Sequence, residues 1–172
     1  MKYRQLHILI GVIAVNRKNL KIYAAWILLA EAVGGLSGWL SRAGMKNYEA
    51  AAVKPPLSPP GFLFPIVWGL LYALMGWGAA RVYLTGDTPA RSRGLNLFVV
   101  QLAVNFFWSL IFFNRQAYLF ALIWLTLLWL LVFAMTKAFY RADALAGRLQ
   151  IPYLIWLAFA AWLNAGVWYL NR

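Results

Sequence analysis

Long apolar stretches alternate with short polar connections along this chain. Five of these stretches, near residues 21–41, 62–84, 95–114, 117–138 and 149–170, are long enough to cross a bilayer, which takes roughly 20 helical residues. The pattern predicts an all-α protein, an integral membrane bundle of five transmembrane helices. We assign residues 1–20 to an N-terminal extension and residues 21–172 to the transmembrane domain.

The connections carry residues that break helices. The first, residues 54–61, holds four prolines within six residues, and each proline lacks a backbone N–H and restricts its predecessor. The second and fourth are predicted at residues 85–89 and 140–148. The third, residues 114–116, is so short that the helices on either side of it must be antiparallel neighbours. Pro152, at the start of the last stretch, fits the first turn of a helix.

One further apolar segment, from Leu6 to Val15, has ten residues and is too short to span. It fits an interfacial helix, a remnant of a signal-like segment or a peripheral extension. No convincing small-residue cleavage site follows it, so we do not assign a signal peptide.

Composition narrows the class of protein. Hydrophobic residues make up 64% of the chain and charged residues 12%, where soluble domains carry about 25% charged residues. A soluble domain, a disordered chain and a nucleic-acid-binding domain are therefore excluded. The chain has no cysteine and a single histidine, His7, which argues against thiolate or histidine metal sites and a Ser-His-Asp triad. We expect no metal, no required cofactor and no nucleic-acid partner.

The net charge of +12 predicts an orientation. Eleven of the sixteen basic residues fall on the side of the N-terminus and five on the other side. Because basic residues accumulate in cytoplasmic segments, we expect the N-terminus inside and the proline-rich connection outside a bacterial cell membrane.

Polar groups inside a membrane are costly and usually face protein or a cavity. Three predicted helices carry such groups at helical spacing. The stripes are Trp68, Tyr72 and Met75; Gln101, Asn105 and Trp108; and Trp156, Ala160 and Asn164. One interpretation is that the amides form interhelical hydrogen bonds and the aromatic rings fill the core of the bundle. Together, however, the stripes favour a pocket for a flat, largely apolar ligand with a few polar groups.

Several other residues need an interpretation. Glu31, the only carboxylate within a predicted span, fits a proton or cation site, but one acid alone makes no relay. We expect it to face the bundle or the interface and to bond a neighbouring helix. Gly34 and Gly38, with Gly35 beside them, and Gly76 and Ala80 favour close helix packing. Trp39, Trp168 and Tyr169 fit the aromatic belt at the membrane surface. The deeper tryptophans need another reason: Trp68, Trp108, Trp124, Trp129 and Trp156.

Three segments resemble a known family. The proline-rich connection followed by residues 65–76 (PIVWGLLYALMG), then residues 101–108 (QLAVNFFW) with 111–113 (IFF), and finally residues 152–164 (PYLIWLAFAAWLN) are similar to the TspO/MBR family. These are the tryptophan-rich sensory proteins, also called translocator proteins or peripheral-type benzodiazepine receptors. The similarity covers about residues 25–172.

The resemblance implies a five-helix bundle, usually a homodimer, whose pocket opens toward the proline-rich connection and binds porphyrins and benzodiazepine-type ligands. By position it implies a pocket lined by Tyr48, Pro59, Trp68, Gln101, Asn105, Trp108, Trp156, Ala160 and Leu163, to which the stripes add Tyr72 and Asn164. The expected ligand is a protoporphyrin IX-like or heme-like tetrapyrrole. For some bacterial members light-dependent porphyrin breakdown has been proposed, which would assign candidate catalytic roles to Trp68 and Trp156.

The sequence departs from the family pattern at several positions. Asn47 precedes Tyr48 where the family has Trp-Tyr, and Leu57 replaces a tryptophan, so the aromatic lid differs. Trp124 replaces an acidic residue of some members. Ala165 occupies the family's tyrosine position, and the sequence around Tyr169 fits the loose sterol motif only weakly, so we do not predict sterol binding.

Three functional hypotheses follow. The first is a membrane receptor or binding protein for porphyrins, in tetrapyrrole sensing or handling. The second is an enzyme that degrades porphyrin in light. The third is a transporter of tetrapyrroles or small hydrophobic molecules, which the absence of inverted repeats and of an intramembrane charge pathway disfavours. A purely structural or regulatory membrane role also stays open.

Overall fold

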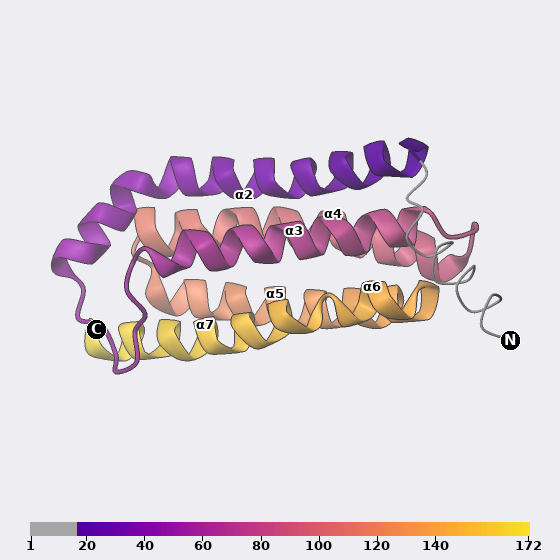
Figure 1. Cartoon of the computed structure of the whole chain (residues 1–172). Coiled ribbons are helices and arrows are strands. Elements are labelled where there is room, and N and C mark those ends of the chain that lie inside the picture. Colours follow the sequence, from indigo (N-terminus) through magenta and orange to yellow (C-terminus); the bar gives the residue numbers. More distant parts are fainter. Residues whose placement is uncertain (1–16) are drawn as a thin grey trace, which may run out of the picture.

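The computed structural model describes residues 17–172, which form a bundle of roughly aligned helices (Figure 1). Of the predicted N-terminal extension, residues 1–20, the part before Arg17, with His7 and the segment 6–15, lies outside the described residues, and residues 17–20 belong to the first helix. The elements are α2 (Arg17–Ala51), α3 (Leu63–Tyr83), α4 (Pro89–Ser109), the π-helix η1 (Leu110–Asn114), α5 (Tyr118–Ala142), α6 (Ala144–Arg148) and α7 (Ile151–Leu170).

Within residues 17–172, five helical segments are long and apolar enough to cross a membrane, which confirms the predicted bundle. With a rise of about 1.5 Å per residue, the 21 residues of α3 extend about 32 Å, close to the roughly 30 Å of a hydrocarbon core. Apolar side chains such as Leu28, Ile123 and Ile155 are exposed on the outside of the bundle. They face the acyl chains in a bilayer.

Two predicted boundaries were wrong. Helix α2 does not end near residue 41 but continues to Ala51. Residues 42–51 are more polar, yet they include good helix formers such as alanine, lysine and glutamate and no proline, so the helix continues beyond the apolar run. The predicted connection at 140–148 is largely helical, because α5 ends at Ala142 and α6 begins at Ala144.

Local signals set the other helix ends. Thr88 caps α4, its side-chain oxygen accepting from the Arg91 N–H at 3.2 Å, and Pro89 follows as the first helical residue. Pro152 lies in the first turn of α7, as predicted. The α4 and α5 helices are antiparallel neighbours, also as predicted, and the Trp124 indole donates to the Val104 carbonyl at 2.8 Å.

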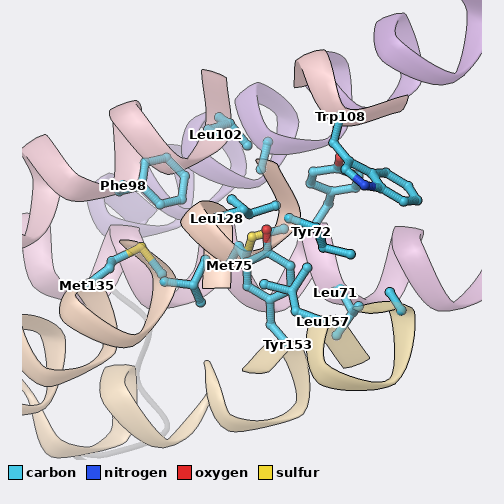
Figure 2. Close-up of a cluster of buried hydrophobic side chains, with 14 of the residues drawn as sticks. Leu71, Tyr72, Met75, Phe98, Leu102, Trp108, Leu128, Met135, Tyr153 and Leu157 are labelled. Carbon is cyan, nitrogen blue, oxygen red and sulfur yellow. The ribbon is translucent and has the colours of Figure 1, made fainter. Parts of the chain in front are cut away.

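One half of the bundle, nearest α6 and the 84–88 connection, is closely packed. We call it the packed half. Its core includes Met75, Phe98, Leu128, Met135 and Tyr153, all buried (Figure 2).

Glycines bring the helices of the packed half together. A Cβ added at Gly76 would lie 2.5 Å from the Ile27 Cα of α2, and one at Gly147 would lie 2.7 Å from the Tyr140 Cα. The predicted packing role of Gly76 is therefore confirmed, and its partner Ala80 is buried as well.

An ion pair joins α3 to the start of α6 in this half. Arg81 donates from Nε to Oδ1 of Asp143 at 3.0 Å and from its terminal nitrogen to Oδ2 at 2.7 Å. Asp143 also caps α6 by accepting from the Ala146 N–H at 2.7 Å. The Arg81 guanidinium holds the pKa of the Asp143 carboxyl below its usual range. The pair fixes α6 against the bundle.

Candidate ligand-binding cavity

The other half of the bundle, nearest the proline-rich connection, contains a cavity of about 560 Å³. We call it the open half. Drug-sized ligands and cofactors occupy pockets of about 300–1,000 Å³. The walls come from α2, α3, α4, η1 and α7, and the proline-rich connection contributes Lys54, Ser58, Pro59 and Gly61.

Most of the residues predicted for the site line this cavity. They are Tyr48, Pro59, Trp68, Tyr72, Asn105, Trp108, Ala160, Leu163 and Asn164. They come from α2, the proline-rich connection, α3, α4 and α7. The fold thus brings together residues that only periodicity and resemblance had associated.

Gln101 and Trp156 were predicted for the site but do not line the cavity. Gln101 shares a helix face with Trp108 but lies seven residues away, about 10 Å deeper along the axis. It is fully buried and accepts from the Tyr153 hydroxyl at 3.1 Å. Trp156 precedes Asn164 by eight residues, which rotates it by about 80° from Asn164 at about 100° per residue. Its ring packs on Phe64 and Phe159 instead.

A hydrogen-bonded pair bounds the cavity at the end nearest the packed half. Asn105 of α4 donates from Nδ2 to the Tyr72 hydroxyl of α3 at 3.2 Å, and both side chains are buried. Met75, the third member of the α3 stripe, lies below them and accepts from Gln101 Nε2 at 3.7 Å. In Figure 2, Tyr72 lies between the packed core around Phe98 and the Trp108 ring.

Flat aromatic surface forms much of the wall. The Trp68 ring lies 5.6 Å from Tyr72 and 6.1 Å from Tyr153, centroid to centroid. Trp108 stacks on Phe112 of η1 with 5.2 Å between the ring centroids. Such a wall suits a ligand with an extended planar system.

Two buried polar atoms of the wall have no hydrogen-bond partner in the described structure. They are Nε1 of Trp108 and Oδ1 of Asn164. Trp108 is 7% exposed and Asn164 is 1% exposed. The amide nitrogen of Asn164 is occupied, since it donates to the Tyr118 carbonyl at 2.8 Å. An unpaired buried donor or acceptor costs about 1–3 kcal/mol, so both atoms favour a ligand with matching groups.

The proline-rich connection is held to α7 near the point where it leaves α2. Val53 and Asn171 exchange two hydrogen bonds of 2.9 Å, from the Val53 N–H to Oδ1 and from Nδ2 to the Val53 carbonyl. Pro55 packs so closely on Gly166 that a Cβ there would lie 2.6 Å from the proline ring. We call residues 53–62 the roof.

Nζ of Lys54, a residue of the roof, lies 3.7 Å from Oε1 of Glu49 and 5.5 Å from the Tyr48 ring centroid. No pattern in the sequence had indicated Lys54, Glu49 or Phe112 as site residues, although all three line the cavity. Their positions depend on the extension of α2 to Ala51 and on the π-helix, and neither has a hydrophobic periodicity that would reveal it.

The remaining tryptophans divide by role. Trp124 and Trp129 donate to the Val104 and Leu154 carbonyls and tie α5 to α4 and α7. Trp39 was predicted near a helix end, but α2 continues to Ala51, and Trp39 lies at the edge of the cavity under the Arg42 guanidinium.

Glu31 and the α2 glycines also differ from expectation. Glu31 lines the cavity, and in the described part of the chain no hydrogen bond to a neighbouring helix is seen. Gly34 packs on the Tyr72 ring, as predicted. A Cβ at Gly35 or Gly38 would meet nothing within 4 Å, so these two glycines open space rather than bring helices together.

Comparison with known proteins places these features in context. The model of the TspO/MBR family matches residues 26–170. The chain is 38% identical over 154 residues to Protein CrtK of Rhodobacter capsulatus, covering 89% of this chain and 94% of that protein. It is 36% identical to the Tryptophan-rich protein TspO of Chlorobaculum tepidum, covering 90% and 98%. It is 40% identical to the human Translocator protein over 131 residues, covering 75% and 77%.

Proposed function

We propose, from the premise that this chain belongs to the TspO/MBR family, that it is a membrane receptor for porphyrins of the protoporphyrin IX type. The cavity in the open half would hold the ligand, and its occupancy would serve the sensing or handling of tetrapyrroles. That the chain is an integral membrane protein follows from its family and its five apolar helices.

The observation that carries this proposal is the combination of volume and lining. A cavity of about 560 Å³ has the capacity for a large ligand, and its walls include eight aromatic side chains. A planar macrocycle offers matching flat surfaces. Its carboxylate substituents would be acceptors of the kind that Trp108 Nε1 lacks.

The geometry favours binding over light-driven chemistry at two tryptophans. Of Trp68 and Trp156, only Trp68 lines the cavity, while Trp156 packs behind Phe64. A porphyrin in the cavity would therefore contact one of the two residues directly. Nothing in the described residues favours the transport hypothesis over simple binding.

A titration with protoporphyrin IX in detergent, followed by tryptophan emission, tests the proposal. We expect saturable quenching in the wild type and weaker, right-shifted quenching in Trp68→Phe. The matched control is Trp77→Phe, because Trp77 lies on the same helix but is half exposed and outside the cavity. Identical curves for all three proteins, or no quenching at all, would reject the proposal.

We further propose that the N-terminus lies on the cytoplasmic side of the cell membrane and that the roof lies on the outer side, as the distribution of basic residues predicts. A reporter fused to the C-terminus should then be active on the outer side. Activity confined to the cytoplasm would reject this orientation. A homodimer remains a proposal from the family resemblance, to be checked by cross-linking in the membrane.

A further inference from the structure

We propose that the cavity also binds aromatic ammonium ions, with the cationic nitrogen beside the Glu31 carboxylate and the aromatic part against the tryptophan and tyrosine rings. This is a second ligand class, opposite in charge to a porphyrin with its acidic side chains. It does not depend on porphyrin binding.

Glu31 is distinguished first by its lack of a basic partner. The chain has four acidic residues. Glu49 pairs with Lys54, Asp87 with Arg91 and Asp143 with Arg81. Among the side chains that the structure describes, no basic group pairs with Glu31, although it lies midway along α2. A carboxylate in a membrane is costly unless it is paired or faces a cavity.

Space for a partner lies directly beside Glu31. Gly35 and Gly38 follow it by four and seven residues, and these positions share its helix face. Because a Cβ at either glycine would meet nothing within 4 Å, the wall next to the carboxylate is open rather than filled by a neighbouring helix. All three residues line the cavity.

The surroundings favour a cation attached to an aromatic system. The Tyr72 ring packs against Gly34, three residues after Glu31 on α2, and the Trp68 ring is 5.6 Å from Tyr72. An ammonium ion between a carboxylate and aromatic faces gains from both, and cation–π contacts contribute about 0.5–2 kcal/mol. An anionic group at the same place would be repelled.

A second observation shows independently that the cavity is incomplete without a ligand. Trp108 Nε1 and Asn164 Oδ1 line the same cavity, are more than nine-tenths buried and have no hydrogen-bond partner. Lys54, the basic residue of the lining, does not neutralise Glu31. Its partner Glu49 lies 18 residues further along α2, or about 27 Å at 1.5 Å per residue.

The experiment compares two probes that differ in charge and hardly in shape: N,N,N-trimethyl-2-naphthylmethylammonium and its neutral carbon analogue 2-neopentylnaphthalene. Each is titrated calorimetrically into the protein in phosphatidylcholine nanodiscs, with empty nanodiscs to correct for partitioning into lipid. We expect the wild type to bind the cation about tenfold more tightly than the neutral probe.

Variants assign that preference to Glu31. Glu31→Gln should weaken binding of the cation about tenfold and change binding of the neutral probe less than about twofold. Asp87→Asn removes the same charge from an exposed site outside the cavity and should retain the preference. Thermal melting in the same nanodiscs verifies that each variant is folded.

Equal binding of both probes to the wild type overturns the proposal without any variant. An unchanged preference in folded Glu31→Gln also overturns it, since the aromatic rings alone would then account for the effect. A protoporphyrin titration on the same preparation tests the porphyrin proposal separately, because either ligand class can fail while the other binds.

Discussion

Two glycines of the packed half, Gly76 and Gly147, and three glycines of the cavity wall, Gly35, Gly38 and Gly69, serve different purposes. In the packed half, Gly76 and Gly147 lie against backbone of other segments, and any side chain there would collide with main chain. In the open half, Gly35, Gly38 and Gly69 face nothing within 4 Å, and their missing side chains leave the cavity empty. A glycine in a membrane helix is therefore a packing device or a space-making device according to what lies opposite.

The ion pairs of the two halves differ in the same direction. Arg81 and Asp143 make two short hydrogen bonds and are mostly buried, while Lys54 and Glu49 approach to 3.7 Å with side chains 35% and 66% exposed. The ion pair of the packed half is thus bidentate and shielded from solvent, and the pair of the open half is longer and more exposed. The following changes test this difference.

The largest expected effect is at Gly76. Gly76→Leu places a side chain where the α2 backbone cannot withdraw, and overpacking of this kind costs about 3 kcal/mol or more. We expect a loss of monodisperse protein or a strongly lowered Tm in detergent. Gly38→Leu is the matched control and should retain the wild-type Tm, because its Cβ meets open space. Equal Tm values would show that the two halves do not differ in packing.

Asp143→Ala should have the next largest effect. It removes a bidentate, partly buried ion pair and a helix cap, for a loss of about 2 kcal/mol in the free energy of unfolding. Glu49→Gln, at the exposed pair of the open half, should change this free energy by less than about 0.5 kcal/mol. Urea or thermal unfolding of the two variants under the same conditions measures the difference.

The same ion pair predicts a pH dependence. The pKa of the Asp143 carboxyl is lower in the folded protein than in the unfolded chain. The ionised carboxyl therefore contributes its full share to the free energy of unfolding above the unfolded pKa. This share is lost as the pH falls through the lower folded pKa. Wild type and Asp143→Ala should therefore converge in stability under strongly acidic conditions. A constant difference at every pH would contradict the assignment.

Gly38→Leu should also reduce ligand binding in the open half. Its side chain would occupy part of the 560 Å³ cavity, and we expect protoporphyrin affinity to fall about tenfold while the fold is unaffected. Gly86→Leu, in the connection at the opposite end, is the control, since a Cβ there also meets nothing within 4 Å. Unchanged affinity in Gly38→Leu would place the ligand elsewhere.

The smallest expected effect is at Leu57 of the roof. This residue has a φ of 64°, in the left-handed region that costs a non-glycine residue about 1–2 kcal/mol, and its side chain is 81% exposed. Leu57→Gly relieves this strain but adds entropy to the unfolded chain. We therefore expect the free energy of unfolding to rise by less than about 1 kcal/mol. Leu57→Ala keeps the strain and should not share the gain. Thermal melting of both variants checks this.

The sequence predicted the bundle because a membrane span leaves a composition signal that does not depend on its neighbours. It predicted most of the cavity lining because aromatic and amide residues recur at helical spacing. Two predicted residues do not line the cavity, because helical spacing alone does not determine rotation about the helix axis or depth along it. Trp156 is rotated away from Asn164 on α7, and Gln101 lies about two turns before Trp108 on α4. Glu31 and Gly38 show a second limit, since only the distance to the opposing helix separates a cavity wall from a packed contact.

The link between Val53 and Asn171 joins residues 118 positions apart, and neither residue lines the cavity. It ties the segment that follows α2 to the end of α7, so the described chain is closed into a ring at this end of the bundle. The α2 end of the roof cannot move away from α7 unless both hydrogen bonds break.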